Sequence, residues 1–185
     1  RKFDEALAVA DEILLRNPEN VRARSVRGQA LLSLKRYGEA AVAFAEVVAR
    51  APTIAINRWD LGLSLAGAGE TAKAEAEWRK AIELEPHLAE PRVSLIAAYR
   101  GRGETAKAAA AAREAAASGA ESAELNFEIG LAYATSGDDS TAERWFESAL
   151  RLRPAYAQAL GNLGRIASER GRVDDSPPVT TLRSR

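Results

Sequence analysis

The sequence predicts an all-α fold, an α-solenoid of antiparallel helix pairs with about ten helices in total. Glycines recur at a spacing of 34 residues or its multiples, at Gly28, Gly62, Gly130 and Gly164. Prolines follow the same step at Pro18, Pro52 and Pro86, and each interval holds two helical patterns separated by a turn. A fixed period of this length indicates helix pairs that contact only their neighbours, so one elongated domain is expected.

Four complete units are expected once Val21 is taken as position 1, and they cover residues 21–54, 55–88, 89–122 and 123–156. Alanine fills position 20 wherever that position occurs, at Ala6, Ala40, Ala74, Ala108 and Ala142. Position 24 carries Ala10, Phe44, Trp78, Ala112 and Phe146. Small residues at positions 8 and 20 let the two helices of a unit approach closely, and a large residue at 24 fills the adjoining space.

The turns of each unit have their own signals. Gly69, Gly103 and Gly137 occupy position 15, where we expect the left-handed backbone that ends a first helix. Proline at position 32 stops the second helix. The unit at 89–122 is degenerate, because its second helix is almost all alanine and lacks this proline. Tighter local packing is the favoured interpretation, and a soft joint in the superhelix is the alternative.

The two ends differ from the complete units. Residues 1–20 match the second helix of a partial N-terminal repeat, whose apolar stripe would be uncovered unless upstream residues or another molecule pack on it. Residues 157–170 are expected to form a C-terminal capping helix. The segment 171–185 is expected to be a flexible tail, because Pro177 and Pro178 forbid a second helix there.

Composition narrows the function. The 26 basic and 26 acidic residues balance, so we expect no nucleic-acid partner, and no apolar run is long enough for membrane insertion. Cysteine is absent, and His87, the one histidine, lies in a turn beside a proline. No metal-ligand cluster, phosphate loop or nucleophile motif is present, so we predict no enzyme activity, no catalytic residue, no metal and no cofactor.

The pattern of Gly at position 8, Ala at 20 and Pro at 32 resembles the tetratricopeptide repeat (TPR) family over about residues 1–170. The resemblance implies a right-handed superhelix whose first helices line a concave groove through positions 2, 5, 9, 12 and 13. It also implies a protein–protein interaction scaffold that binds a peptide or helix of a partner protein. The alternatives are a regulatory or substrate-docking domain of a larger enzyme such as a transferase, and self-association through the N-terminal end.

The groove positions supply the candidate site residues. Its middle is apolar, with Ile56, Trp59, Leu63, Val93, Phe127 and Leu131, and its polar members are Arg22, Ser25, Gln29 and Arg100. An exposed apolar patch of this kind favours a docking surface, and aromatic residues are common hot spots. The alternative is that these side chains fill gaps between adjacent first helices. Trp59 stands one place after position 4, where the family usually has tryptophan.

Position 4 instead carries a ladder of Arg24, Arg58 and Arg92. We favour a structural role in which the stems pack at the unit junction and the guanidinium groups reach Glu or Asp at the rim. The alternative is a site for an acidic or phosphorylated partner segment. The Ala- and Arg-rich composition suggests a bacterial protein, for which the cytoplasm is the default location and the periplasm the alternative.

Overall fold

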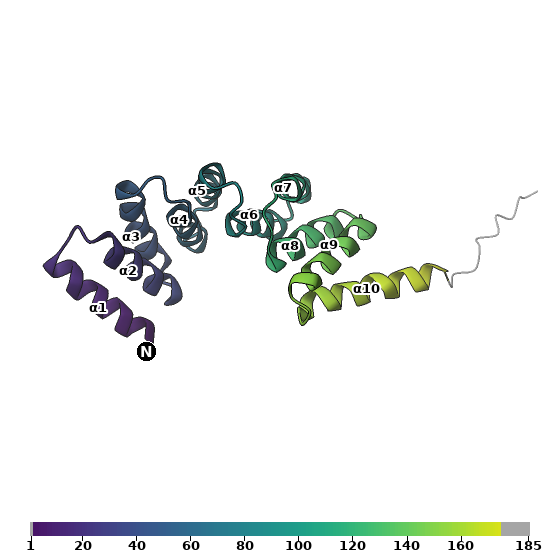
Figure 1. The fold of residues 1–185 in the computed structure, drawn as a ribbon, viewed down its shortest axis with the longest axis horizontal. Coiled ribbons are helices and arrows are strands. Elements are labelled where there is room, and N and C mark those ends of the chain that lie inside the picture. The colour runs from purple at the N-terminus through teal and green to yellow at the C-terminus, as the bar shows by residue number, and fades with distance from the viewer. Residues whose placement is uncertain (1, 175–185) are drawn as a thin grey trace, which may run out of the picture.

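The computed structural model describes residues 2–174, with side chains for residues 2–171. Within this range the chain forms ten α-helices and no strand (Figure 1). The helices are α1 (Lys2–Arg16), α2 (Val21–Ser33), α3 (Tyr37–Arg50), α4 (Ala55–Gly67), α5 (Thr71–Leu84), α6 (Glu90–Gly101), α7 (Thr105–Ala117), α8 (Ala123–Thr135), α9 (Asp139–Leu152) and α10 (Ala157–Asp174).

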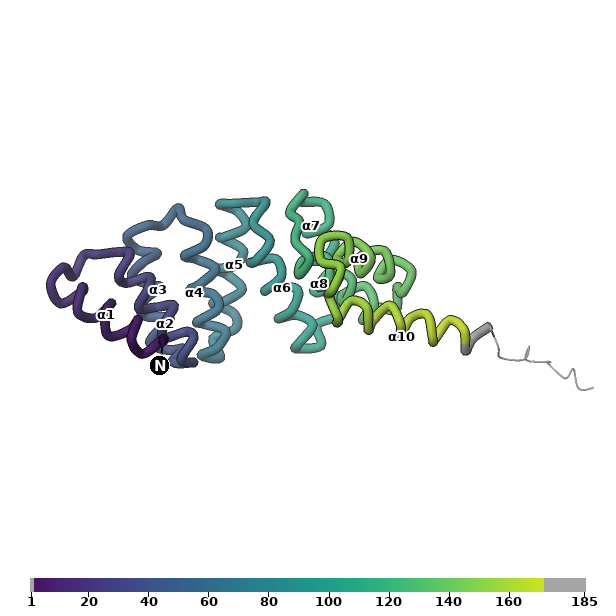
Figure 2. Tube along the Cα trace, turned by 60° about the horizontal axis from the view of Figure 1, so that its bottom comes forward, coloured from purple at the N-terminus to yellow at the C-terminus, as the bar shows by residue number. Residues whose placement is uncertain are grey.

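The helices form one continuous row. Each helix packs on the next one in the chain, and the first helices of adjacent units, α4 with α6 and α6 with α8, also touch. Figures 1 and 2 both place α1 and α10 at opposite ends of this row. In Figure 1 the row bends, with α4, α6 and α8 on its inner side and α5 and α7 outside. The structure therefore confirms the expected all-α solenoid.

Helix pairs are held together by an aromatic ring on a glycine. A Cβ atom added at Gly28 would lie 2.8 Å from the Phe44 ring, and one at Gly130 would lie 2.7 Å from the Phe146 ring. The Phe44 and Phe146 side chains are fully buried. Only glycine allows this approach, because real Cβ contacts are longer. The 34-residue glycine spacing is thus a packing requirement of the second helix on the first.

In the alanine-rich unit at 89–122, the large and the small side chain of this contact change places between the two helices. Position 8 is Ile96 instead of glycine, and position 24 is Ala112 instead of an aromatic residue, and both side chains are fully buried in the main hydrophobic core. A large residue on α6 thus replaces the ring that the other units supply from the second helix. Small side chains on α7 are in keeping with the direct contact between α6 and α8.

The turns inside the units follow the prediction for position 15. Gly69, Gly103 and Gly137 have φ values of 85°, 71° and 86°, which confirms the left-handed backbone. Lys35 occupies the same position in the unit at 21–54 and also has a positive φ, of 59°. Lysine has a Cβ atom, so this conformation is strained there and relaxed in the other units.

The final helix is longer than the capping helix expected at 157–170, because α10 continues to Asp174. Residues 171–174 contain no proline, and a glycine such as Gly171 is tolerated near a helix end, so the helix need not stop at 170. The remainder of the expected tail, residues 175–185, lies outside the described residues. No helix of the described chain has the length and apolar character needed to span a membrane.

Candidate partner-binding groove

Trp59 lies where the first helices of two units meet. Its indole Nε1 on α4 donates a hydrogen bond to the Ser94 Oγ on α6 at 2.9 Å. Its backbone carbonyl accepts a bond of 3.3 Å from the Trp78 Nε1. Trp59, Leu63 and Val93 are partly buried against the main core, whereas Ile56 is 39% exposed. The middle of the predicted groove is therefore partly packed between helices and partly open.

A cavity of about 390 Å³ opens beside the indole, and we call it the Trp59 cavity. It lies between α4, α6 and α8, at the N-terminal ends of the latter two helices. Its lining consists of Trp59, Glu90, Val93, Ser94, Ser122 and Glu124. The cavity thus combines an apolar wall with two hydroxyl groups and two carboxylates.

The two carboxylates have different surroundings. Glu124 is half-buried and bonds to the guanidinium of Arg153, which also stacks over the Tyr156 ring at 4.9 Å. A backbone hydrogen bond and the Arg153 side chain lower the pKa of Glu124, so its carboxylate is ionised at neutral pH. Glu90 is exposed at the start of α6 and makes no ion pair with the side chains of residues 2–171.

The C-terminal part of the predicted groove is closed by aromatic packing. Phe127 is only 9% exposed, and its ring centroid lies 4.9 Å from that of Tyr156 and 5.7 Å from that of Phe146. Leu131 packs against the same cluster. Arg100 is also engaged, because its Nη1 binds the Glu128 Oε2 at 2.6 Å. Burial raises the pKa of Glu128 despite this ion pair.

The N-terminal polar residues lie beside α1. Gln29 lines a cavity of about 460 Å³ between α1 and α2, and Arg22 lines a second one of about 220 Å³. Val26 contributes to both. Ser25 donates its hydroxyl proton to the Val21 carbonyl at 3.1 Å. These residues therefore form a surface separate from the Trp59 cavity.

The arginine ladder closes the turns between units. Arg92 donates to the Pro86 carbonyl through Nε at 3.3 Å and Nη2 at 2.9 Å, and Arg58 Nε donates to the Pro52 carbonyl at 3.0 Å. Arg24 contacts the Pro18 carbonyl in the same way. Arg24 also pairs with Glu46, and Arg58 with Glu77 at 2.8 Å. Burial lowers the pKa of Arg92. Each of the three guanidinium groups thus has at least one acceptor within the chain.

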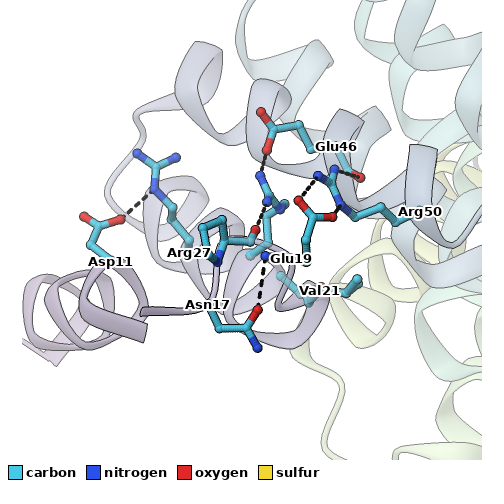
Figure 3. A network of polar contacts seen from close by, with 10 residues as sticks. Asp11, Asn17, Glu19, Val21, Arg27, Glu46 and Arg50 are labelled. Carbon is cyan, nitrogen blue, oxygen red and sulfur yellow. Dashed lines mark hydrogen bonds and ion pairs between the residues drawn. The ribbon is translucent and has the colours of Figure 1, made fainter. Parts of the chain in front are cut away.

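Polar contacts also tie α1 to the rest of the row. Arg27 binds Asp11 on α1 at 2.7 Å, and Arg50 binds Glu19 in the α1–α2 turn at 3.0 Å (Figure 3). In the same view Glu46 lies on α3, near the turn between α1 and α2. The first turn is therefore held by charged groups from α1, α2 and α3.

Four residues of the Trp59 cavity are absent from the predicted site. Glu90 and Glu124 both occupy position 2, and the sequence shows that two consecutive units carry glutamate there. Ser94 occupies position 6, outside the five groove positions, and Ser122 precedes its unit as the N-cap of α8. A Ser at position 34 followed by Glu two residues later was an available signal for an acceptor-rich helix start.

The ring-on-glycine helix pairs and the inner face of first helices define this molecule as a helical-repeat protein. A model described as Tetratricopeptide repeat matches residues 1–53 and 94–157, which is more than half of the chain. The chain belongs to the tetratricopeptide repeat family. Among curated proteins, none matches it.

Solved structures with the same fold are TPR proteins of low sequence identity. The C-terminal part of a TPR repeat-containing protein from Cytophaga hutchinsonii is 13% identical with a TM-score of 0.78, over 95% of this chain and 69% of that one. MamA is 24% identical with a TM-score of 0.69, over 84% and 91%. YrrB, described as a TPR protein with an unusual peptide-binding site, is 19% identical with a TM-score of 0.62, over 86% and 82%.

Many acidic side chains of the described residues are paired with basic ones. No group of three or more His, Cys, Asp and Glu side chains among the described residues is arranged to hold a metal ion. Glu124 and Glu128, whose pKa values are shifted, are paired with arginines, whereas burial raises the pKa of Asp60 on α4 to about 6. The described residues of the predicted groove form no nucleophile–base pair.

Proposed function

We propose that this chain is a protein–protein interaction scaffold that binds a segment of a partner protein at the Trp59 cavity. The observation that carries the proposal is the cavity itself, which opens between the three first helices α4, α6 and α8. Its apolar wall and the 39% exposed Ile56 nearby on α4 would be covered by a partner side chain. The same surface would serve if the chain is a docking domain of a larger enzyme.

Two further facts support a peptide-binding role. Trp59 presents a large, amphipathic side chain fixed by its bond to Ser94, and rigid tryptophans are frequent binding hot spots. YrrB, a structural neighbour, is described as having a peptide-binding site, although its low identity makes this a likeness of fold. The exposed apolar residues near the cavity would add contact area buried on binding, and the cavity would determine which side chain of the partner binds.

The test is a selection of nine-residue random peptides on the immobilised full chain, with affinities then measured by fluorescence anisotropy. We expect Ile56→Glu and Trp59→Ala to weaken the selected peptides about 30-fold or more, since the loss of a hot-spot contact costs about 2 kcal/mol or more. Trp145→Ala is the matched control, because Trp145 is a half-buried tryptophan on the second helix α9.

Thermal melts of each variant separate lost binding from lost folding. Ile56 is partly exposed, so we expect Ile56→Glu to remain folded even if Trp59→Ala does not. Equal affinity of the selected peptides for the parent and for Ile56→Glu and Trp59→Ala would remove the groove assignment.

A second candidate function is self-association, and the open face of α1 favours it. Val9 and Ile13 are 57% and 40% exposed, whereas Ala43 and Val47, their equivalents in the next unit, are 2% and 0% exposed. In the next unit, neighbouring helices therefore cover these positions.

The last helix has the complementary open face. In α10, Leu160 is 52% exposed, and a Cβ at Gly164 would meet no atom within 4 Å. Among residues 2–174, α1 has no first helix of its own unit packed on it, and α10 has no second helix of its own unit packed on it. A second copy could join the two faces head to tail.

Sedimentation velocity over a concentration series tests this candidate. We expect Ile13→Glu and Leu160→Glu to be monomers alone and to form one-to-one dimers when mixed, because each retains one intact end. Association of Leu160→Glu alone would point instead to contacts between two α1 faces. A parent chain that stays monomeric throughout the concentration series would exclude both modes.

A further inference from the structure

We propose that the Trp59 cavity accepts a lysine or arginine side chain of the partner segment. The inference rests on the proposed function and specifies the chemistry of the bound segment. It follows from the shape of the cavity, from its inventory of donors and acceptors, and from the state of the charged groups around it.

The walls of the cavity suit an aliphatic stem. Trp59 and Val93 provide an apolar surface, and the single donor of the indole is already used by the Ser94 hydroxyl. A ligand group beside the indole therefore meets a π-face and methyl groups. Long basic side chains bury their methylene stems on such surfaces and keep the charged head at a polar rim.

The rim of the cavity offers acceptors. The Glu90 and Glu124 carboxylates accept hydrogen bonds and donate none when ionised. The Ser122 hydroxyl accepts from the Leu125 N–H at 3.0 Å, as the cap of α8. Among the side chains of the lining, only the two serine hydroxyl groups have a proton that a ligand could accept, since the indole N–H is bonded to Ser94. A bound group rich in donors, as ammonium and guanidinium groups are, would match these side-chain acceptors.

The charge balance also requires a cation. Glu124 is already neutralised in part by Arg153, which shows that this carboxylate accepts a guanidinium group. Glu90 has no such partner within the described part of the chain, and covering it with an apolar or acidic side chain would desolvate an unpaired charge. A lysine or arginine head between Glu90 and the free side of Glu124 would satisfy both carboxylates.

An acidic partner segment fits this face less well. The arginines that would attract it are engaged within the chain, since Arg58 binds Pro52 and Glu77, and Arg92 binds Pro86. Arg100 is held by Glu128. The accessible charge beside the apolar wall is therefore negative, although the whole chain has no net charge.

The experiment uses the peptides selected on the full chain and replaces each basic residue with norleucine, which keeps an apolar stem and removes the charge. We expect one lysine or arginine whose replacement weakens binding to the parent about 10-fold, as for the loss of a charge-assisted contact. On Glu90→Gln the same replacement should cost about 2-fold or less, because only Glu124 remains and Arg153 already neutralises part of its charge. Glu83→Gln, an exposed carboxylate on α5, should behave like the parent.

The outcomes separate this inference from the proposed function. The inference would be overturned if the selected peptides need Trp59 but contain no essential basic residue, or if their norleucine forms bind equally well. Either result would leave the scaffold function in place. Selected peptides that bind Trp59→Ala as well as the parent would overturn both. A lysine dependence that persists unchanged in Glu90→Gln would assign the cation to another site.

Discussion

Replacing two glycines at the same repeat position by alanine should have opposite effects on stability. At Gly130 the added Cβ would lie 2.7 Å from the Phe146 Cε1, a fully buried ring atom that has no room to move. At Gly164 the added Cβ would meet nothing within 4 Å. Both glycines lie within helices, α8 and α10, and neither has a positive φ. The pair therefore isolates the contact between helix and ring.

The magnitudes follow from two effects. Alanine favours a helix interior over glycine by about 0.5–1 kcal/mol, and both variants gain this amount. Overpacking a filled core costs about 1–3 kcal/mol, and only Gly130→Ala incurs it. We expect Gly164→Ala to be stabilised by up to about 1 kcal/mol, and the free energies of unfolding of the two variants to differ by about 1–3 kcal/mol.

Urea denaturation followed by circular dichroism measures these free energies, and hydrogen exchange of the α8 and α9 amides shows where Gly130→Ala opens. The unit at 89–122 provides a rescue, since it places Ile96 and Ala112 at the same two positions. The double variant Gly130→Ile/Phe146→Ala should be more stable than the sum of its single changes predicts. Equal stability of Gly130→Ala and Gly164→Ala would refute the argument that the ring requires the glycine.

Three other outcomes are expected. Lys35→Gly should raise the unfolding free energy by about 0.5–1 kcal/mol in denaturant titrations, because the φ of 59° is strained for lysine. Burial raises the pKa of Asp60 from 3.8 to about 6. The native state therefore takes up a proton at a higher pH than the unfolded chain does, and this group adds up to ~3 kcal/mol of stability as the pH falls from 7 towards 4. Thermal melts of Asp60→Asn should lack this gain and show a higher Tm at pH 7. Arg92→Lys should lose about 1 kcal/mol in urea titrations, since lysine cannot bind the Pro86 carbonyl through two nitrogens.

The repeat period was sufficient to predict the helices and turns, because each contact that fixes them recurs at the same position. The site was less predictable, since a shared position does not guarantee shared burial. Trp59 and Phe127 both occupy position 5, yet Phe127 is covered by Tyr156 at position 34 of its own unit. The equivalent residue beside Trp59 is Leu88, which is smaller and cannot stack on the indole. Burial of a groove residue thus depends on the volumes of the side chains around it, and its own repeat position does not predict that burial.

The family pattern at position 4 was also incomplete as a guide. Tryptophan at that position is replaced by Arg24, Arg58 and Arg92, and spacing alone left both a structural and a binding role open. The choice depends on the partners of the guanidinium groups, which are backbone carbonyls six residues earlier. A backbone acceptor leaves no trace in residue identity, so sequence analysis had no means of finding it.

Those arginine–carbonyl bonds have a consequence for how the chain assembles and evolves. Each spans six residues and joins a turn to the helix that follows it, so the angle between units is set inside one short segment. A copied or deleted stretch of 34 residues would carry its own angle-setting contact with it. The array can therefore lengthen or shorten by whole units without redesign of its neighbours, and it can fold outward from any turn that forms first. Beyond Arg92 the bond is missing, because Asn126 binds the Ser148 side chain instead, and the geometry there depends on α8 and α9 together.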